Sequence, residues 1–128
     1  MTRPEARVQA LEVLYEAEQR DGTIAAAHVT ARAQRVIEGV LEHEEAIDAV
    51  VGRLSKRWSI DRMPVIDRVL LRLGAWELLH TDTPTAVVIS EVVGLAGIYS
   101  TQRSGHFING VLGALAEEAR PEGDEPVT

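Results

Sequence analysis

The chain has 128 residues, of which 45% are hydrophobic and 26% charged, with no cysteine and a net charge of −7. This length suits one domain with a single core, and the composition is ordinary for a soluble globular protein. It excludes disulfide bonds and thiolate chemistry, disfavours bulk attraction to nucleic acid, and offers no apolar run of about 18 residues for a membrane span. We expect a cytoplasmic protein.

The first half of the chain is expected to be helical. Apolar side chains recur every three or four positions over residues 4–20, and Pro4 suits a first helical turn. Residues 24–28 predict a short second helix. From Thr30 to about Arg57 the helical spacing continues, which predicts one long helix.

The second half continues the pattern. Residues 59–64 predict a turn that leads into a helix over residues 65–80. That helix is apolar on more than one side, so we expect it to be central. Residues 86–100 predict a further helix despite many β-branched side chains, residues 101–105 a loop, and residues 106–118 the last helix.

These elements predict an all-α bundle of about six to seven helices, with no strand pair and no repeat. A single domain is expected over residues 1–118, with an N-terminal half at 1–58 and a C-terminal half at 59–118. Residues 119–128 belong to an acidic stretch, EEARPEGDEPVT, and are expected to be a disordered tail.

One dipeptide conflicts with its surroundings. Asn109-Gly110 is typical of a hairpin turn, yet Ile108, Val111 and Leu112 follow helical spacing. A glycine inside a helix costs about 1 kcal/mol relative to alanine. Two explanations remain open: Gly110 leaves room for a neighbouring backbone, or it is simply tolerated and Asn109 faces solvent.

Several segments, in order, resemble the NusB family. They are ARVQALEVLYEAE at residues 6–18, WSIDRMPVIDRVLLRLGAWELL at 58–79, Pro84 with VVISEV at 87–92, and SGHFINGVL at 104–112. The resemblance covers residues 3 to about 116. It implies an all-α fold of two small helical subdomains, and a non-catalytic transcription antitermination factor.

The resemblance also implies partners. Members of this family pair with the ribosomal small-subunit protein NusE, and together they bind a short single-stranded RNA element, boxA. They join an antitermination complex on RNA polymerase during ribosomal RNA synthesis. Bases of a single strand are open to stacking and edge contacts.

Carried over residue by residue, the resemblance predicts two sites. The expected RNA-binding residues are Arg3, Arg7, Gln102, Arg103, Ser104 and Phe107, and the expected partner-binding residues are Tyr15 and Asp67. The family often has more basic residues where this chain has Pro4 and Glu5, so we expect weaker and less salt-sensitive RNA binding.

Some of these residues also fit purely structural roles. Arg3 and Arg7 also fit a solvated helix start, and Phe107 and Tyr15 also fit core positions. Arg72 is expected to form a structural ion pair or a helix-end contact rather than to contact RNA.

The residues show no HExxH pair, phosphate loop or nucleophile elbow, so we expect no enzyme, no cofactor and no metal site. One alternative is a NusB-like interaction module with weak or lost RNA binding. A NusB-like domain fused to a ribosomal RNA cytosine methyltransferase is disfavoured, because no catalytic domain follows before Thr128. Whether the free chain is a monomer or a homodimer is left open.

Overall fold

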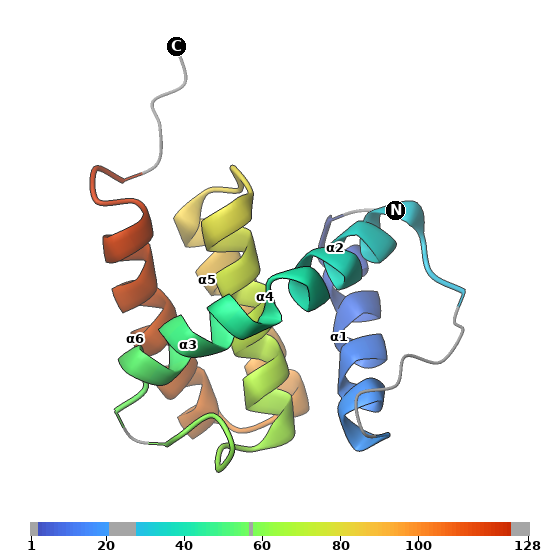
Figure 1. Cartoon of the computed structure of the whole chain (residues 1–128), viewed down its shortest axis with the longest axis horizontal. Helices are drawn as coiled ribbons and strands as arrows, with labels where there is room; N and C mark the ends of the chain where they lie inside the picture. Colours follow the sequence, from blue (N-terminus) through green and yellow to red (C-terminus); the bar gives the residue numbers. More distant parts are fainter. Residues whose placement is uncertain (1–2, 21–27, 57, 124–128) are drawn as a thin grey trace.

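A computed structural model describes residues 3–20, 28–56 and 58–123 and contains six α-helices and no strand in those ranges (Figure 1). The helices are α1 (Arg3–Gln19), α2 (Ala31–Glu42), α3 (Glu44–Leu54), α4 (Val65–His80), α5 (Thr85–Tyr99) and α6 (Gln102–Ala119). The predicted all-α fold is confirmed. The helix predicted at residues 24–28 falls almost wholly outside the described residues.

The centre of the fold is α4, which packs against each of the other five helices (Figure 1). Leu70, Leu71 and Leu73 are completely buried, which confirms the central position predicted from apolar residues on several sides of this helix. Gly74 permits a close approach of α6, because a Cβ there would lie 2.6 Å from a methyl carbon of Leu112. None of the described helices is long and apolar enough to cross a bilayer.

The long helix predicted from Thr30 to Arg57 is wrong in one respect, because it breaks at His43 into α2 and α3. The backbone of His43 has φ −106° and ψ 11°, outside the helical range, although its N–H still donates to the Gly39 carbonyl at 3.2 Å. The break lets α2 pack against α1 while α3 packs against α6. No proline marks this position, so spacing alone did not predict it.

The His43 ring stacks on His80 at the end of α4, with ring centroids 3.9 Å apart. Burial lowers the pKa of His80 below its ordinary value, and the neighbouring His43 lowers it further, while Glu42 opposes the shift. A lowered pKa means that the unfolded chain takes up this proton more readily than the folded chain. The contribution of the neutral His80 ring to the free energy of unfolding is therefore complete above about pH 6.5, and it is lost as the pH falls below that value.

His80→Gln is accordingly expected to reduce the drop in Tm between about pH 7.5 and about pH 5.5. The measurement is thermal unfolding of both proteins at the two pH values. The exposed His28, which no ring contacts among the described residues, supplies the matched control His28→Gln. An unchanged pH dependence in His80→Gln would show that the stacked pair does not carry this effect.

Asn109 and Gly110 both lie on the exposed face of α6. Apart from the surrounding backbone of α6, no heavy atom lies within 4 Å of the position that a Cβ on Gly110 would take, so the packing explanation for this glycine is wrong and the solvent-facing one holds. A close approach does occur at Gly39 on α2. A Cβ there would lie 2.4 Å from the indole ring of Trp76, so glycine is what allows Trp76 to pack across α2.

Arg120 falls in the stretch expected to be a disordered tail, but it is anchored. Its guanidinium donates to the carbonyl oxygens of Thr83 at 2.6 Å, Thr81 at 2.7 Å and Leu78 at 3.2 Å. Carbonyls at the end of a helix lack partners within it, so this arginine caps α4 from the end of α6. The tail prediction is therefore wrong for Arg120, and residues 124–128 lie outside the described residues.

Candidate functional site

The last helix begins at Gln102, so the loop predicted over residues 101–105 is wrong for most of its length. Thr101 is the N-cap, and its hydroxyl accepts a hydrogen bond from the Ser104 backbone N–H at 2.9 Å. This cap stabilises a first turn in which Gln102 and Arg103 are exposed and Ser104 is buried. Gln102, Arg103 and the half-buried Phe107 form what we call the α6 patch.

Asp67, expected to contact a protein partner, is completely buried in the first part of α4. Its two carboxylate oxygens accept hydrogen bonds from the hydroxyls of Ser100 at 2.8 Å and Ser104 at 2.7 Å. The direct contacts predicted for Asp67 and for Ser104 are not supported by this arrangement, because both side chains point into the protein. Instead they join α4 to the α5–α6 connection and hold the α6 patch in place.

Phe107 packs edge-on against Trp58, with ring centroids 5.0 Å apart and ring planes 68° apart. Both rings are half-buried and pack against the core. The core role considered for Phe107 is therefore present, and its remaining exposed part adjoins the exposed turn of Gln102 and Arg103. Such a ring offers a face or an edge to an unstacked base.

Tyr15 is 38% exposed and lies on the wall of an apolar hollow of about 240 Å³ between α1, α4 and α5. The other lining residues are Leu11, Glu12, Ile66 and Tyr99. Tyrosines at the edge of an apolar hollow are typical of protein interfaces, because they bury a large area yet keep a polar tip. We call this region the tyrosine hollow.

Arg7 is only 2% exposed, which conflicts with its predicted role as an RNA contact. Its Nε and Nη2 atoms donate to the two carboxylate oxygens of Glu77 at 2.6 and 2.7 Å. The guanidinium is thus held in a bidentate ion pair between α1 and α4, and the predicted phosphate contact is not supported. Arg3 is the first residue of α1, and its side chain lies outside what the structure describes.

The predicted residues contact α4 at two places. Arg7 pairs with Glu77 near the end of α4, whereas Ser104 bonds to Asp67 near its beginning. Ten helical residues separate these two contacts along α4, or about 15 Å. Ile66 and Tyr99 of the tyrosine hollow directly precede Asp67 and Ser100, which bond to each other beside the start of α6, so the hollow lies near the α6 patch. Arg7 lies one helical turn before Leu11, at the other side of the hollow.

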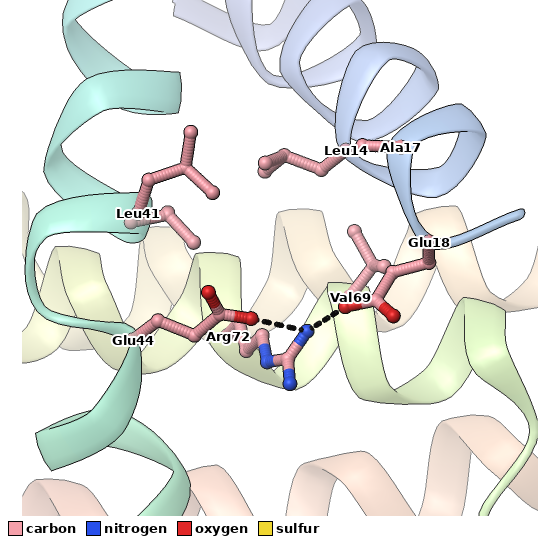
Figure 2. Close-up of a pocket in the computed structure, with 8 residues that line it drawn as sticks. Leu14, Ala17, Glu18, Leu41, Glu44, Val69 and Arg72 are labelled. Atoms are coloured by element: carbon pink, nitrogen blue, oxygen red, sulfur yellow. Dashed lines mark hydrogen bonds and ion pairs between the residues drawn. The ribbon is translucent and has the colours of Figure 1, made fainter. Parts of the chain in front are cut away.

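Arg72 forms the structural ion pairs that its position predicted (Figure 2). Its guanidinium bonds to Asp48 at 2.8 and 2.7 Å, pairs with Glu44 at 2.9 Å and also contacts Glu18. Burial by itself lowers the pKa of Arg72, but the hydrogen bonds to Asp48 and Glu18 outweigh it and raise the pKa above its ordinary value. This charge is therefore permanent and already neutralised.

The cavity beside Arg72 is small, about 40 Å³, and lies among Leu14, Leu41 and Val69 (Figure 2). That volume holds about one water molecule and not a ligand. No group of three or more metal-ligating side chains occurs within residues 3–20, 28–56 and 58–123.

Of the residues that line the tyrosine hollow, only Tyr15 was predicted, and Leu11, Glu12, Ile66 and Tyr99 were not. Tyr99 follows the buried Val88, Val92 and Leu95 at helical spacing, but it is 43% exposed. One sequence signal could have indicated Tyr99: it is one of only two tyrosines in the chain, and it stands at the end of an apolar helical segment.

Comparisons with known proteins agree with this fold. Residues 4–117 match the profile of the NusB family. A transcription antitermination protein NusB of Pseudarthrobacter chlorophenolicus is 43% identical over 129 residues, covering 90% of this chain and 93% of that protein. The protein of the same name from Kineococcus radiotolerans is 44% identical, again with 90% and 93% covered.

Two solved structures extend the comparison. NusB of T. maritima superposes with a TM-score of 0.85 at 32% identity, covering 95% of this chain and 96% of that one. A chain from a complex of the antitermination factors NusB and NusE with double-stranded RNA gives a TM-score of 0.78 at 28% identity, covering 92% and 99%.

Proposed function

The chain belongs to the NusB family, and we propose from this premise that it is an antitermination factor that binds boxA-type single-stranded RNA together with NusE during ribosomal RNA transcription. It is not an enzyme. The proposal includes a cytoplasmic location and a place in the antitermination complex on RNA polymerase.

One observation carries the proposal: Tyr99 of the tyrosine hollow ends α5, and only Ser100 and Thr101 separate it along the chain from Gln102 of the α6 patch. The hollow is apolar and bordered by Tyr15 and Tyr99, as a protein interface requires. The patch supplies a cation, an amide and an aromatic ring, as recognition of a single strand requires. A partner seated on the hollow would extend the RNA surface beyond the patch.

On the RNA side, we assign phosphate contact to Arg103 and base contact to Gln102 and Phe107. Arg103 is exposed, and no ion pair occupies it among the described residues. Ser104 and Asp67 act indirectly, since their hydrogen bonds fix the first turn of α6. Arg3 stays in the proposal as a contact for a strand that runs toward the other end of α4.

The first test separates the two surfaces with single substitutions. Arg103→Gln is expected to weaken RNA binding about three- to tenfold at moderate salt and to reduce the salt slope by about 0.7, the value for one phosphate contact on a single strand. Tyr15→Ala is expected to weaken NusE binding by about 2 kcal/mol if it is an interface anchor. The measurement is titration with a boxA-type RNA and with the same organism's NusE, each at two salt concentrations.

Arg53→Gln on α3 is the control, because it also removes one exposed arginine, which pairs with Glu118 at the end of α6 far from the α6 patch. An RNA duplex of the same sequence serves as competitor, since the related complex contains double-stranded RNA. Equal RNA affinities for Arg103→Gln and Arg53→Gln would refute the α6 patch, and unchanged NusE binding in Tyr15→Ala would refute the hollow.

The alternative function, an interaction module with weak or lost RNA binding, draws on a specific observation. Glu77 holds Arg7, so the start of α1 presents fewer free cations than its sequence indicates. In that case NusE would bind to the protein, whereas RNA would bind neither to the protein alone nor to the pair. The same titrations therefore decide between the two functions.

A further inference from the structure

A groove of about 260 Å³ lies where the starts of α1 and α2 meet the end of α4 and the connection that follows α4. Its lining residues are Ala6, Arg7, Arg32, Arg35, Val36, Trp76, Glu77, Thr81, Asp82 and Thr83. The tyrosine hollow and the α6 patch contain none of these residues, so the groove is a separate feature of the surface.

The groove carries positive charge that has no partner in the described part of the chain. Arg32 and Arg35 lie one turn apart on α2, and both are exposed. Neither forms an ion pair or a side-chain hydrogen bond with another described residue. Of the two carboxylates that line the groove, Glu77 is already held by Arg7, so only Asp82 opposes the two free guanidinium groups. The groove therefore attracts anions.

Arg120 ties the end of α6 to the wall of this groove. Its guanidinium donates to the carbonyl oxygens of Thr81 at 2.7 Å and Thr83 at 2.6 Å, and both threonines line the groove. The ends of α4 and α6 accordingly lie on the same side of the bundle (Figure 1). Arg120 therefore fixes the point from which the rest of the chain continues.

The sequence beyond Arg120 has the charge that would complement the groove. Residues 121–128, which we call the acidic tail, read PEGDEPVT and hold three acids, Asp124 and Glu125 among them, with no base. The N–H of Gly123 donates to the Arg120 carbonyl at 2.8 Å, so a turn reverses the chain after α6. The five residues that follow span up to about 17 Å when extended, whereas the four-residue connection at the wall of the groove spans at most about 14 Å.

We propose that the acidic tail folds back into this groove. Asp124 and Glu125 pair there with the two free guanidinium groups, since a carboxylate accepts paired hydrogen bonds from a guanidinium. An exposed ion pair is weak by itself. Because the tail is tethered at the end of α6, however, its acids are present at an effective concentration of about a millimolar or more, and docking needs no second molecule.

Docking of the acidic tail regulates RNA binding, and this part of the inference rests on the proposed function. The tail and RNA are both anions, so a docked tail neutralises cations and repels a strand on the same side of the molecule. The tail is thus an intramolecular competitor of RNA. Salt releases it, because the Debye length falls from about 10 Å at 0.1 M to about 3 Å at 1 M.

The experiment uses a spin label, because the chain contains no cysteine and Val127→Cys supplies a single thiol for a nitroxide. The indole N–H signals of both tryptophans are followed by NMR on the full labelled chain. Trp76 lines the groove, whereas Trp58 packs against Phe107 of the α6 patch and is the internal reference. At about 0.1 M salt the label is expected to broaden the Trp76 signal more than the Trp58 signal, and at about 1 M salt this difference is expected to vanish.

The tail variant Asp124→Asn/Glu125→Gln removes the carboxylates that we assign to the ion pairs. In the labelled chain it is expected to abolish the excess broadening of the Trp76 signal. The control Glu45→Gln/Asp61→Asn changes the net charge by the same amount but removes two exposed acids on other elements. The control is expected to keep the excess broadening.

The variant Arg32→Gln/Arg35→Gln removes the other side of the ion pairs and is also expected to abolish the excess broadening. RNA binding is measured without the label, by titration with a boxA-type RNA. The tail variant is expected to bind RNA about threefold more tightly than the control variant at about 0.1 M salt, because two weak exposed pairs no longer compete with RNA.

Each outcome decides one part. A Trp76 signal that is broadened no more than the Trp58 signal overturns docking, and broadening that persists at high salt overturns the ion pairs. Equal broadening in the tail variant and the control overturns the assignment to Asp124 and Glu125. Docking with equal RNA affinities in the tail variant and the control overturns the competition. Docking in a protein that binds no RNA refutes the proposed function and leaves docking standing.

Discussion

Replacing Glu77 with alanine is expected to lower the free energy of unfolding by about 3–5 kcal/mol, the usual cost of breaking a buried ion pair. Glu77 and Arg7 are 4% and 2% exposed, and two short hydrogen bonds join them. Without Glu77, the guanidinium is left buried and unpaired between α1 and α4. The measurement is equilibrium unfolding in urea, with far-UV circular dichroism as the signal.

Two further variants show whether this loss of stability comes from the buried, unpaired charge of Arg7. Arg7→Met/Glu77→Leu removes both charges and fills the space, and it is expected to recover most of the lost stability. Glu118→Ala breaks the pair with Arg53, which is exposed on both sides, and is expected to change stability little. If Glu77→Ala lowers the free energy of unfolding no more than Glu118→Ala does, the buried pair between α1 and α4 stabilises the protein no more than an exposed pair.

Replacing Asp67 with alanine is expected to cost about 2–4 kcal/mol, because two hydrogen bonds to a buried carboxylate are lost together. The hydroxyls of Ser100 and Ser104 are left with each other and with Thr101 as partners. The first turn of α6 then loses its tie to α4. RNA affinity should therefore fall severalfold although Asp67 does not reach the surface, whereas a direct partner contact would instead weaken NusE binding.

The exposed Asp61 in the turn before α4 provides the matched control Asp61→Ala. Asp67→Asn keeps the size of the side chain and one carbonyl acceptor, so it should restore part of both stability and RNA affinity. RNA binding that stays at the wild-type level in Asp67→Ala, measured where the protein is fully folded, would remove the positioning role.

Helical spacing was enough to predict the class of fold and the central helix, because the burial of a helix face depends on local periodicity. The contacts that decide the site are not local. Arg7 and Glu77 are 70 residues apart, and Asp67 and Ser104 are 37 apart. A sequence pattern assigns a side chain to a face but does not name its partner across the chain, so Arg7 was taken for a surface cation.

The boundaries that were predicted incorrectly have the same cause. The break at His43 lets α2 pack against α1 and α3 pack against α6. Arg120 is held in place because it donates hydrogen bonds to carbonyls at the end of another helix. Thr101, in contrast, is a local signal, since a threonine N-cap three residues before the backbone N–H that it binds is common. That signal was available in the sequence and would have placed the start of α6 correctly.

The central position of α4 also governs how the protein unfolds. The helices of both halves pack against this one helix, so both halves lose part of their core if α4 leaves. Unfolding should therefore be a single cooperative transition, with the amides of α4 the slowest to exchange with solvent. A ligand that binds at either end of α4 then stabilises the entire molecule, and its affinity can be read from one shift of one melting curve.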